Sequence, residues 1–96
     1  RLSMALGGIP VGVDPGYERA VTLQEEPRLR LLFYPSGAVR FEHLCKSATR
    51  TVVCAPALPR EKFTIESLDP VTLNPSIECP DCHTHGFVRS GSWVRA

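Results

Sequence analysis

The chain has 96 residues, so it can build one hydrophobic core and is too short for two independent ones. Hydrophobic residues make up 43% of it and charged residues 22%, a balance that excludes general disorder. The net charge of +1 excludes a strong overall attraction to nucleic acids or membrane surfaces, and no apolar run reaches the roughly 18 residues of a membrane span.

Glycine and proline punctuate the chain and leave little room for long helices. Residues 1–16 contain Gly7, Gly8, Pro10 and Gly12 but are otherwise rich in apolar side chains. We therefore expect an extended N-terminal arm that packs on its own sheet or contacts a partner protein or a second copy. The arm has no clear basic head and no small-residue cleavage site, so a signal peptide is not expected.

The clearest predicted element is a β-hairpin. Two strand-like segments, residues 29–34 and 38–44, flank a turn at residues 35–37. The proline of this turn sets φ near −65° and its glycine accepts a positive φ, as a tight turn requires. The second strand carries His43 and Cys45 to the far end of the hairpin.

The other predicted strands are short. They comprise residues 17–24 with a β-prone centre at 20–23, then residues 51–55, 63–68 and 71–73, followed by a terminal hairpin of residues 87–89 and 93–95. The alternation in residues 63–68 predicts that Phe63, Ile65 and Leu68 point inward. We expect residues 17–96 to form a single, mainly β domain of antiparallel hairpins closed around a zinc site, similar to a zinc ribbon.

The sequence Cys79-Pro80-Asp81-Cys82 has the spacing of a zinc knuckle. Such a loop brings both sulfurs to one point, and tetrahedral zinc accepts such a pair. A redox dithiol is the alternative, but it favours a helix N-terminus, whereas residues 83–88 lead into a β pattern. Four cysteines with no secretory signal favour a metal in a reducing compartment, with two disulfides as the alternative.

One knuckle supplies two ligands, so the others must come from elsewhere in the chain. Cys45 is the expected third ligand, because it ends a hairpin strand and a thiolate binds structural zinc well. His85 is the expected fourth, because the glycine after it lets the backbone turn tightly. His43 could replace either of them, and Cys54 is expected to be a buried small hydrophobe. The predicted metal site is therefore Cys45, Cys79, Cys82 and His85.

Catalytic patterns are missing from the sequence. It contains no His-Glu-x-x-His motif, no deaminase order of His-x-Glu before Pro-Cys-x-x-Cys, and no phosphate-binding loop. An enzyme is therefore not expected. A nucleic-acid-binding zinc ribbon is the alternative, because the terminal hairpin offers charge and stacking through Phe87, Arg89, Trp93 and Arg95. Acidic residues elsewhere offset these cations, so we do not favour it.

The last third of the chain also resembles a known pattern. Residues 71–77 read Val-Thr-Leu-Asn-Pro-Ser-Ile and are followed by the Cys79/Cys82 knuckle, by His-Gly-Phe at residues 85–87 and by Gly-Ser-Trp at residues 91–93. This order is similar to that of small uncharacterised zinc-knuckle proteins encoded by actinobacterial phages. The resemblance implies metal binding through Cys79, Cys82 and His85, a location in a host cytoplasm or a virion, and no established activity.

Together these features predict a non-enzymatic, zinc-stabilised module that binds a protein or takes part in assembly. It would be phage-encoded and would act on a host factor or form part of a virion. A metalloenzyme is the least favoured hypothesis, because a catalytic zinc keeps one position open and needs a nearby general base.

Overall fold

The computed structural model describes residues 3–5, 15–46 and 51–96. These ranges contain strands, one short 3-10 turn (η1, Arg60–Lys62) and no α-helix, which confirms the prediction of a mainly β protein. The strands are β1 (Ser3–Ala5), β2 (Arg19–Gln24), β3 (Leu29–Phe33), β4 (Val39–Lys46), β5 (Thr51–Cys54), β6 (Thr64–Leu68), β7 (Val71–Asn74), β8 (Ser76–Glu78), β9 (His85–Arg89) and β10 (Ser92–Arg95).

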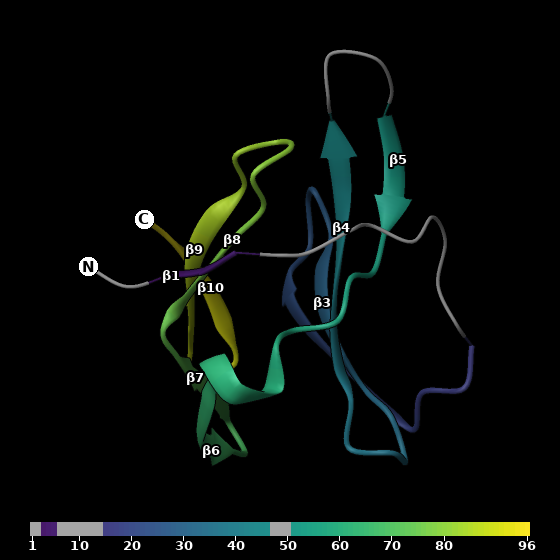
Figure 1. Cartoon of the computed structure of the whole chain (residues 1–96), viewed down its shortest axis with the longest axis vertical. Coiled ribbons are helices and arrows are strands. Elements are labelled where there is room, and N and C mark those ends of the chain that lie inside the picture. Colours follow the sequence, from purple (N-terminus) through teal and green to yellow (C-terminus); the bar gives the residue numbers. More distant parts are fainter. Residues whose placement is uncertain (1–2, 6–14, 47–50) are drawn as a thin grey trace.

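Two four-stranded sheets lie side by side in Figure 1, one made of β2 to β5 and the other of β1 and β8 to β10. The first sheet has the order β2-β3-β4-β5 and is antiparallel throughout. The second has the order β1-β8-β9-β10, and in it only β1 runs parallel to its neighbour. β6 and β7 form a separate hairpin, drawn below the second sheet.

Both predicted hairpins form. β3 pairs with β4 around a turn in which the Gly37 amide donates to the Tyr34 carbonyl over 2.9 Å, and Gly37 has a φ of 91°. β9 pairs with β10 around Ser90 and Gly91, which both have positive φ. β4 continues to Lys46, beyond the predicted end at residue 44. This length carries Cys45 to the loop between β8 and β9 of the other sheet.

The core lies between the two sheets and includes Leu31 and Phe41 from the first, Ile77 and Val88 from the second, and Leu73 from β7. Trp93 packs against this core, with its ring 5.3 Å from that of Phe41 and nearly parallel to it. Gly86 makes room for the indole, because a Cβ there would lie 2.6 Å from the ring of Trp93. The single tryptophan is thus a packing residue of the terminal hairpin.

One prediction about β6 is wrong. Ile65 and Leu68 were expected to point inward, but they are 38% and 53% exposed. Within the described residues β6 pairs only with β7, and the pairing is interrupted by a bulge between Ile65 and Ser67. An alternating pattern identifies the strand but cannot show whether a second layer covers its apolar face. Phe63, before the strand, does pack against the core.

Part of the expected N-terminal arm belongs to the second sheet. β1 pairs with β8 from Ser3 opposite Ser76 to Ala5 opposite Glu78. The remainder of the arm, residues 1–2 and 6–14, lies outside the described residues. In the described part of the chain, no helix has the length and hydropathy needed to cross a membrane.

Candidate metal centre

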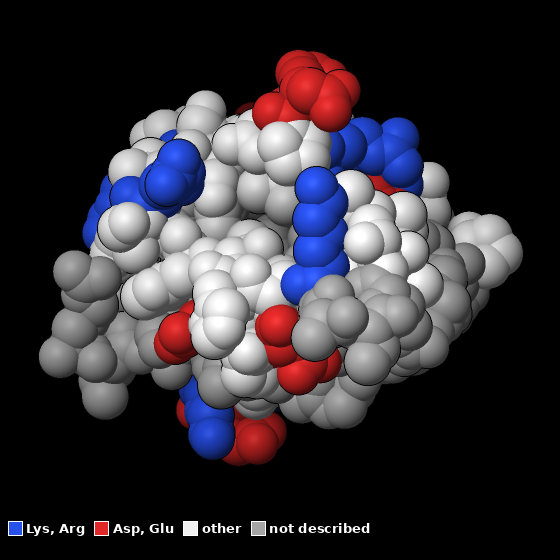
Figure 2. Space-filling model, turned by 90° about the horizontal axis from the view of Figure 1, so that it is seen from above, with Lys and Arg blue, Asp and Glu red and all other residues white. Residues whose placement is uncertain are grey.

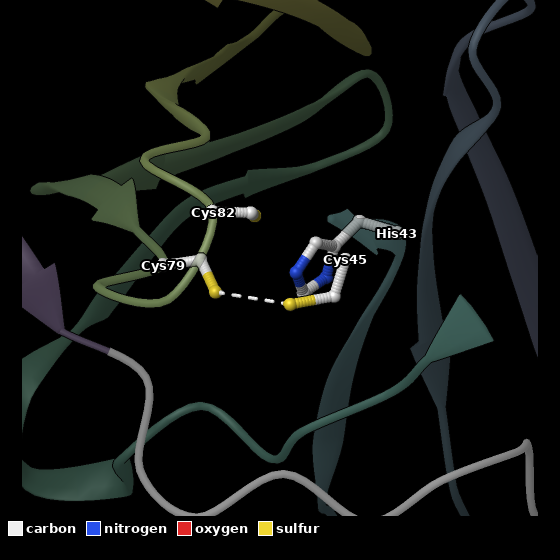
Figure 3. A group of neighbouring side chains, drawn as sticks. All are labelled: His43, Cys45, Cys79 and Cys82. Atoms are coloured by element: carbon white, nitrogen blue, oxygen red, sulfur yellow. Dashed lines mark hydrogen bonds between the residues drawn. The ribbon is translucent and has the colours of Figure 1, made fainter. Parts of the chain in front are cut away.

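Four side chains from two parts of the fold meet in a metal-ligand cluster. His43 and Cys45 lie on β4, and Cys79 and Cys82 lie in the loop between β8 and β9. One ligand atom from each residue lies within 4.8 Å of all the others, and Figure 3 shows the loop cysteines facing the β4 side chains. The group could therefore hold a metal ion.

The sulfur spacing fits a tetrahedral ion. The Sγ atoms of Cys45 and Cys79 are 3.9 Å apart. With metal–sulfur bonds of about 2.3 Å, two thiolates at tetrahedral positions are separated by about 3.8 Å. The two sulfurs thus already lie at the separation that one shared ion would impose.

β4 delivers two ligands because side chains on a strand alternate between its faces. His43 and Cys45 are two residues apart and share the face that Phe41 also occupies, and both are buried. The Phe41 ring stacks on the His43 imidazole with their centroids 5.0 Å apart. This stacking fixes the plane of the imidazole beside the thiols.

Backbone hydrogen bonds shape the cysteine loop. The His83 amide donates to the Cys79 carbonyl and the Cys79 amide donates to the Thr84 carbonyl, each over 2.8 Å. His83 closes the turn with a φ of 61°, in the left-handed region. The closed turn sets Cys79, which is fully buried, and Cys82, which is half-buried, on the side that faces β4.

The imidazole of His43 has one nitrogen that the described residues leave without a hydrogen-bond partner. Nδ1 lies 3.4 Å from the Phe41 carbonyl, which can only accept, so Nδ1 carries the proton. Nε2 is buried and has no hydrogen-bond partner among the described residues. A buried polar atom without a partner is costly, and a metal ion would satisfy this lone pair. Metal-bound histidines commonly hold their second nitrogen to a carbonyl in this way.

Burial keeps His43 neutral, as metal binding needs, but it also favours the protonated form of Cys45 and Cys79 until an ion stabilises their thiolates. Burial lowers the pKa of His43, although the hydrogen bond to Phe41 opposes this, so the imidazole stays neutral as a ligand must be. Burial, with added contributions from Cys79 and Cys82, raises the pKa of Cys45 far above its ordinary value. A dication would be needed to stabilise this buried thiolate.

The two knuckle thiols differ from each other. Burial raises the pKa of Cys79 even though the amides of Asp81 and Cys82 favour its thiolate. For Cys82, burial is outweighed by hydrogen bonds from the hydroxyl and backbone of Thr84 and from the neighbouring thiols, so its pKa is lowered. The Thr84 hydroxyl lies 3.1 Å from the Cys82 sulfur. Among the three thiols of the cluster, Cys82 is therefore the one whose thiolate is favoured by its surroundings.

The structure brings together three of the four predicted ligands, Cys45, Cys79 and Cys82, and adds His43. It places His85 elsewhere, at the start of β9, where its Nε2 lies 3.0 Å from the Ser76 hydroxyl. Strand pairing fixes the backbone of His85 opposite Glu78 in the ladder, and its imidazole lies against Ser76 and not among the thiols. The sequence did indicate that His43 could be a ligand. It lies two residues before Cys45, and residues two apart on a strand share a face.

Cys54 stays outside the metal-ligand cluster. It lies opposite His43 in the β4–β5 ladder, is 1% exposed, and its thiol lies 3.8 Å from the Val52 carbonyl. Its burial agrees with the expectation of a small hydrophobic residue. His83 is exposed and also lies outside the cluster.

No protein-family model, curated protein or solved structure matches this chain. Function is therefore inferred from the metal-ligand cluster and its surroundings.

Proposed function

We propose that this chain is a non-enzymatic, zinc-stabilised module for protein binding or assembly, with one zinc ion bound by His43, Cys45, Cys79 and Cys82. The observation that supports it is the meeting of four buried or half-buried ligand atoms within 4.8 Å of one another. Three thiolates and one imidazole form a ligand set that is common in structural zinc sites. Soft thiolates also select against magnesium and calcium.

The position of the ion supports a structural role. His43 and Cys45 belong to the sheet of β2 to β5, whereas Cys79 and Cys82 connect two strands of the other sheet. One ion would therefore join the two sheets directly. A chain of 96 residues buries a limited apolar area, so such a link adds free energy of folding that the core alone would lack.

The number of ligands argues against catalysis at the metal. A catalytic zinc usually keeps a position for water or substrate, whereas four protein ligands complete a tetrahedral shell. An ion with a complete coordination shell cannot bind a further molecule. A partner would therefore contact the protein surface and not the ion. This is why we favour a binding or assembly role over a metalloenzyme.

Nucleic-acid binding has less support. Figure 2 shows basic and acidic side chains interspersed over one face of the protein. The Trp93 ring is occupied by packing on Phe41 and is not a free platform for a base. A phage origin, and a location in a host cytoplasm or a virion, rest only on the resemblance of the C-terminal third.

Two matched pairs of variants test the zinc site. His43→Ala should weaken zinc binding by at least about a hundredfold, and His85→Ala should leave it unchanged. Likewise, Cys45→Ser should abolish tight binding, whereas Cys54→Ser should retain one zinc per chain. Elemental analysis gives the zinc content, and the visible spectrum of the cobalt-substituted protein reports the number of thiolate ligands.

The same experiment can contradict the proposal in two ways. Purified protein that contains no metal and two disulfides would exclude the zinc site. Loss of zinc in His85→Ala with retention in His43→Ala would exclude this ligand set.

A further inference from the structure

A cleft with a volume of about 610 Å³ opens beside the metal-ligand cluster. Its walls come from three places: the β2–β3 turn with Glu26 and Pro27, residues 83–85 after the knuckle, and β10 with Trp93 and Arg95. Leu44 of β4 also lines it. This volume falls in the range of sites that hold a small ligand or a few side chains.

Two segments that line this cleft adjoin the metal-ligand cluster along the chain. Leu44 lies between His43 and Cys45 in sequence, and residues 83–85 follow Cys82 directly. The two lining segments belong to different sheets and are brought together by the cluster. The cleft therefore depends on the same link that a bound ion would provide.

A second hollow, of about 360 Å³, continues the first. Both are lined by Glu26, Pro27 and Leu44, so they meet along these residues. The second hollow extends to Val53 on β5, which is 44% exposed. We call the two hollows together the knuckle groove. Its apolar lining includes Pro27 and Leu44 in both hollows, Trp93 in the first and Val53 in the second.

The charges at the rim of the knuckle groove indicate what it would accept. Glu25 and Glu26 are exposed and form no ion pair within the residues that the structure describes. Arg28, on the same rim, already lies 3.4 Å from Glu42. Arg95 lines the first hollow only, so the acidic end of the groove is the second hollow, where Glu25 and Glu26 repel phosphate groups and attract a cation.

We propose that the knuckle groove binds an extended segment of a partner protein in which an apolar side chain stands next to a lysine or arginine. The apolar side chain lies on Leu44 and Pro27, and its basic neighbour lies against Glu25 and Glu26. Binding requires zinc, because the ion holds the two walls together. This inference rests on the proposed zinc module and names the partner chemistry of its surface.

An array of immobilised synthetic peptides, probed with the zinc-loaded full chain, tests the proposal. Members that pair leucine or phenylalanine with lysine or arginine should bind, whereas members with glutamate in place of the basic residue should not. The double variant Glu25→Gln/Glu26→Gln should bind the same members roughly fivefold more weakly, the loss expected for two exposed charge pairs. The matched control is Glu66→Gln, an exposed position on β6 that should bind as the parent does.

The fluorescence of Trp93 locates the bound peptide, because this single tryptophan lines the cleft. Binding that leaves the Trp93 spectrum unchanged, binding that ignores the charge of the peptide, or no peptide binding at all would overturn the proposal. Preferential binding of a single-stranded oligonucleotide would do the same.

Zinc analysis of the same samples separates this inference from the proposed function. Zinc-loaded protein that binds no peptide contradicts the groove alone, whereas protein that takes up no zinc contradicts the metal module. Unchanged peptide binding after verified removal of zinc would contradict the dependence on the ion.

Discussion

At the scale of single residues, a buried acid on β4 is the best-defined electrostatic feature outside the cluster. Arg30 donates to the two carboxylate oxygens of Glu42 over 2.6 and 2.9 Å. Glu42 is 2% exposed, and Arg28 adds a second cation nearby. The hydrogen bonds from Arg30 lower the pKa of Glu42 below its ordinary value of 4.5, although burial opposes them. The charged form of Glu42 therefore stabilises the fold.

Glu42→Gln should lower the free energy of unfolding at neutral pH by about 1–3 kcal/mol, because Arg30 loses a charged, buried partner. The pKa of Glu42 is lower in the folded protein than in the unfolded chain. The ion pair therefore contributes its full stability at a pH above the pKa of the unfolded chain, and this contribution is lost as the pH falls through the pKa of the folded protein. The difference between parent and variant should thus be constant above pH 4.5 and shrink below it. Urea unfolding at several pH values measures this difference.

Glu66→Gln is the control for this prediction, because Glu66 is exposed on β6. It should change the free energy of unfolding little at any pH. A Glu42→Gln variant as stable as its parent at neutral pH would show that the Arg30 pair contributes nothing net, as happens for some buried ion pairs.

At the scale of elements, β4 connects the metal-ligand cluster with the core. Its inner face carries Phe41 into the core and then His43 and Cys45 to the knuckle. Its pairing with β3 and β5 on either side holds this register. A register shift of one residue would turn both ligands away from the cysteine loop.

The pairing of β1 with β8 leads to a prediction about the N-terminal arm. Deletion of residues 1–16 would uncover the edge of β8 and leave its backbone groups without their ladder partners. The shortened chain should therefore melt at a temperature several degrees lower or change its assembly state. Thermal unfolding followed by circular dichroism, together with light scattering for the mass, tests this. An unchanged melting point and an unchanged mass would contradict it.

At the scale of the whole molecule, the ion is expected to hold the two sheets as one folding unit. Structural zinc in small domains contributes about 10–16 kcal/mol of apparent binding free energy. Whole domains are stable by only about 5–15 kcal/mol. Removal of the ion should therefore unfold most of the chain.

A strong chelator should release zinc and unfold the protein together, and added zinc should restore both. The emission of Trp93 should shift to the red as its ring leaves the stack on Phe41, and circular dichroism should lose its β signal. The control is the same chelator already saturated with zinc. Protein verified as metal-free that keeps its melting curve would show that the core alone supports the fold.

Local chemistry was enough to predict much of this protein. Proline and glycine turns with alternating side chains identified both hairpins, because turn type and strand period are properties of a few neighbouring residues. The spacing of Cys79 and Cys82 likewise identified the loop that contributes two residues to the metal-ligand cluster, because both lie in one turn. Cys45 was predicted as the third ligand because it lies at the end of a hairpin strand.

Tertiary structure decided the remaining points. Whether His43 or His85 faces the thiols depends on how the two sheets pack, since each histidine lies on a strand with two faces. The exposure of Ile65 and Leu68 depends on whether another layer covers β6, which no local pattern encodes. The knuckle groove exists only where Leu44 and the loop after Cys82 meet. These contacts join residues far apart in the chain, so packing between sheets, and not local propensity, determines them.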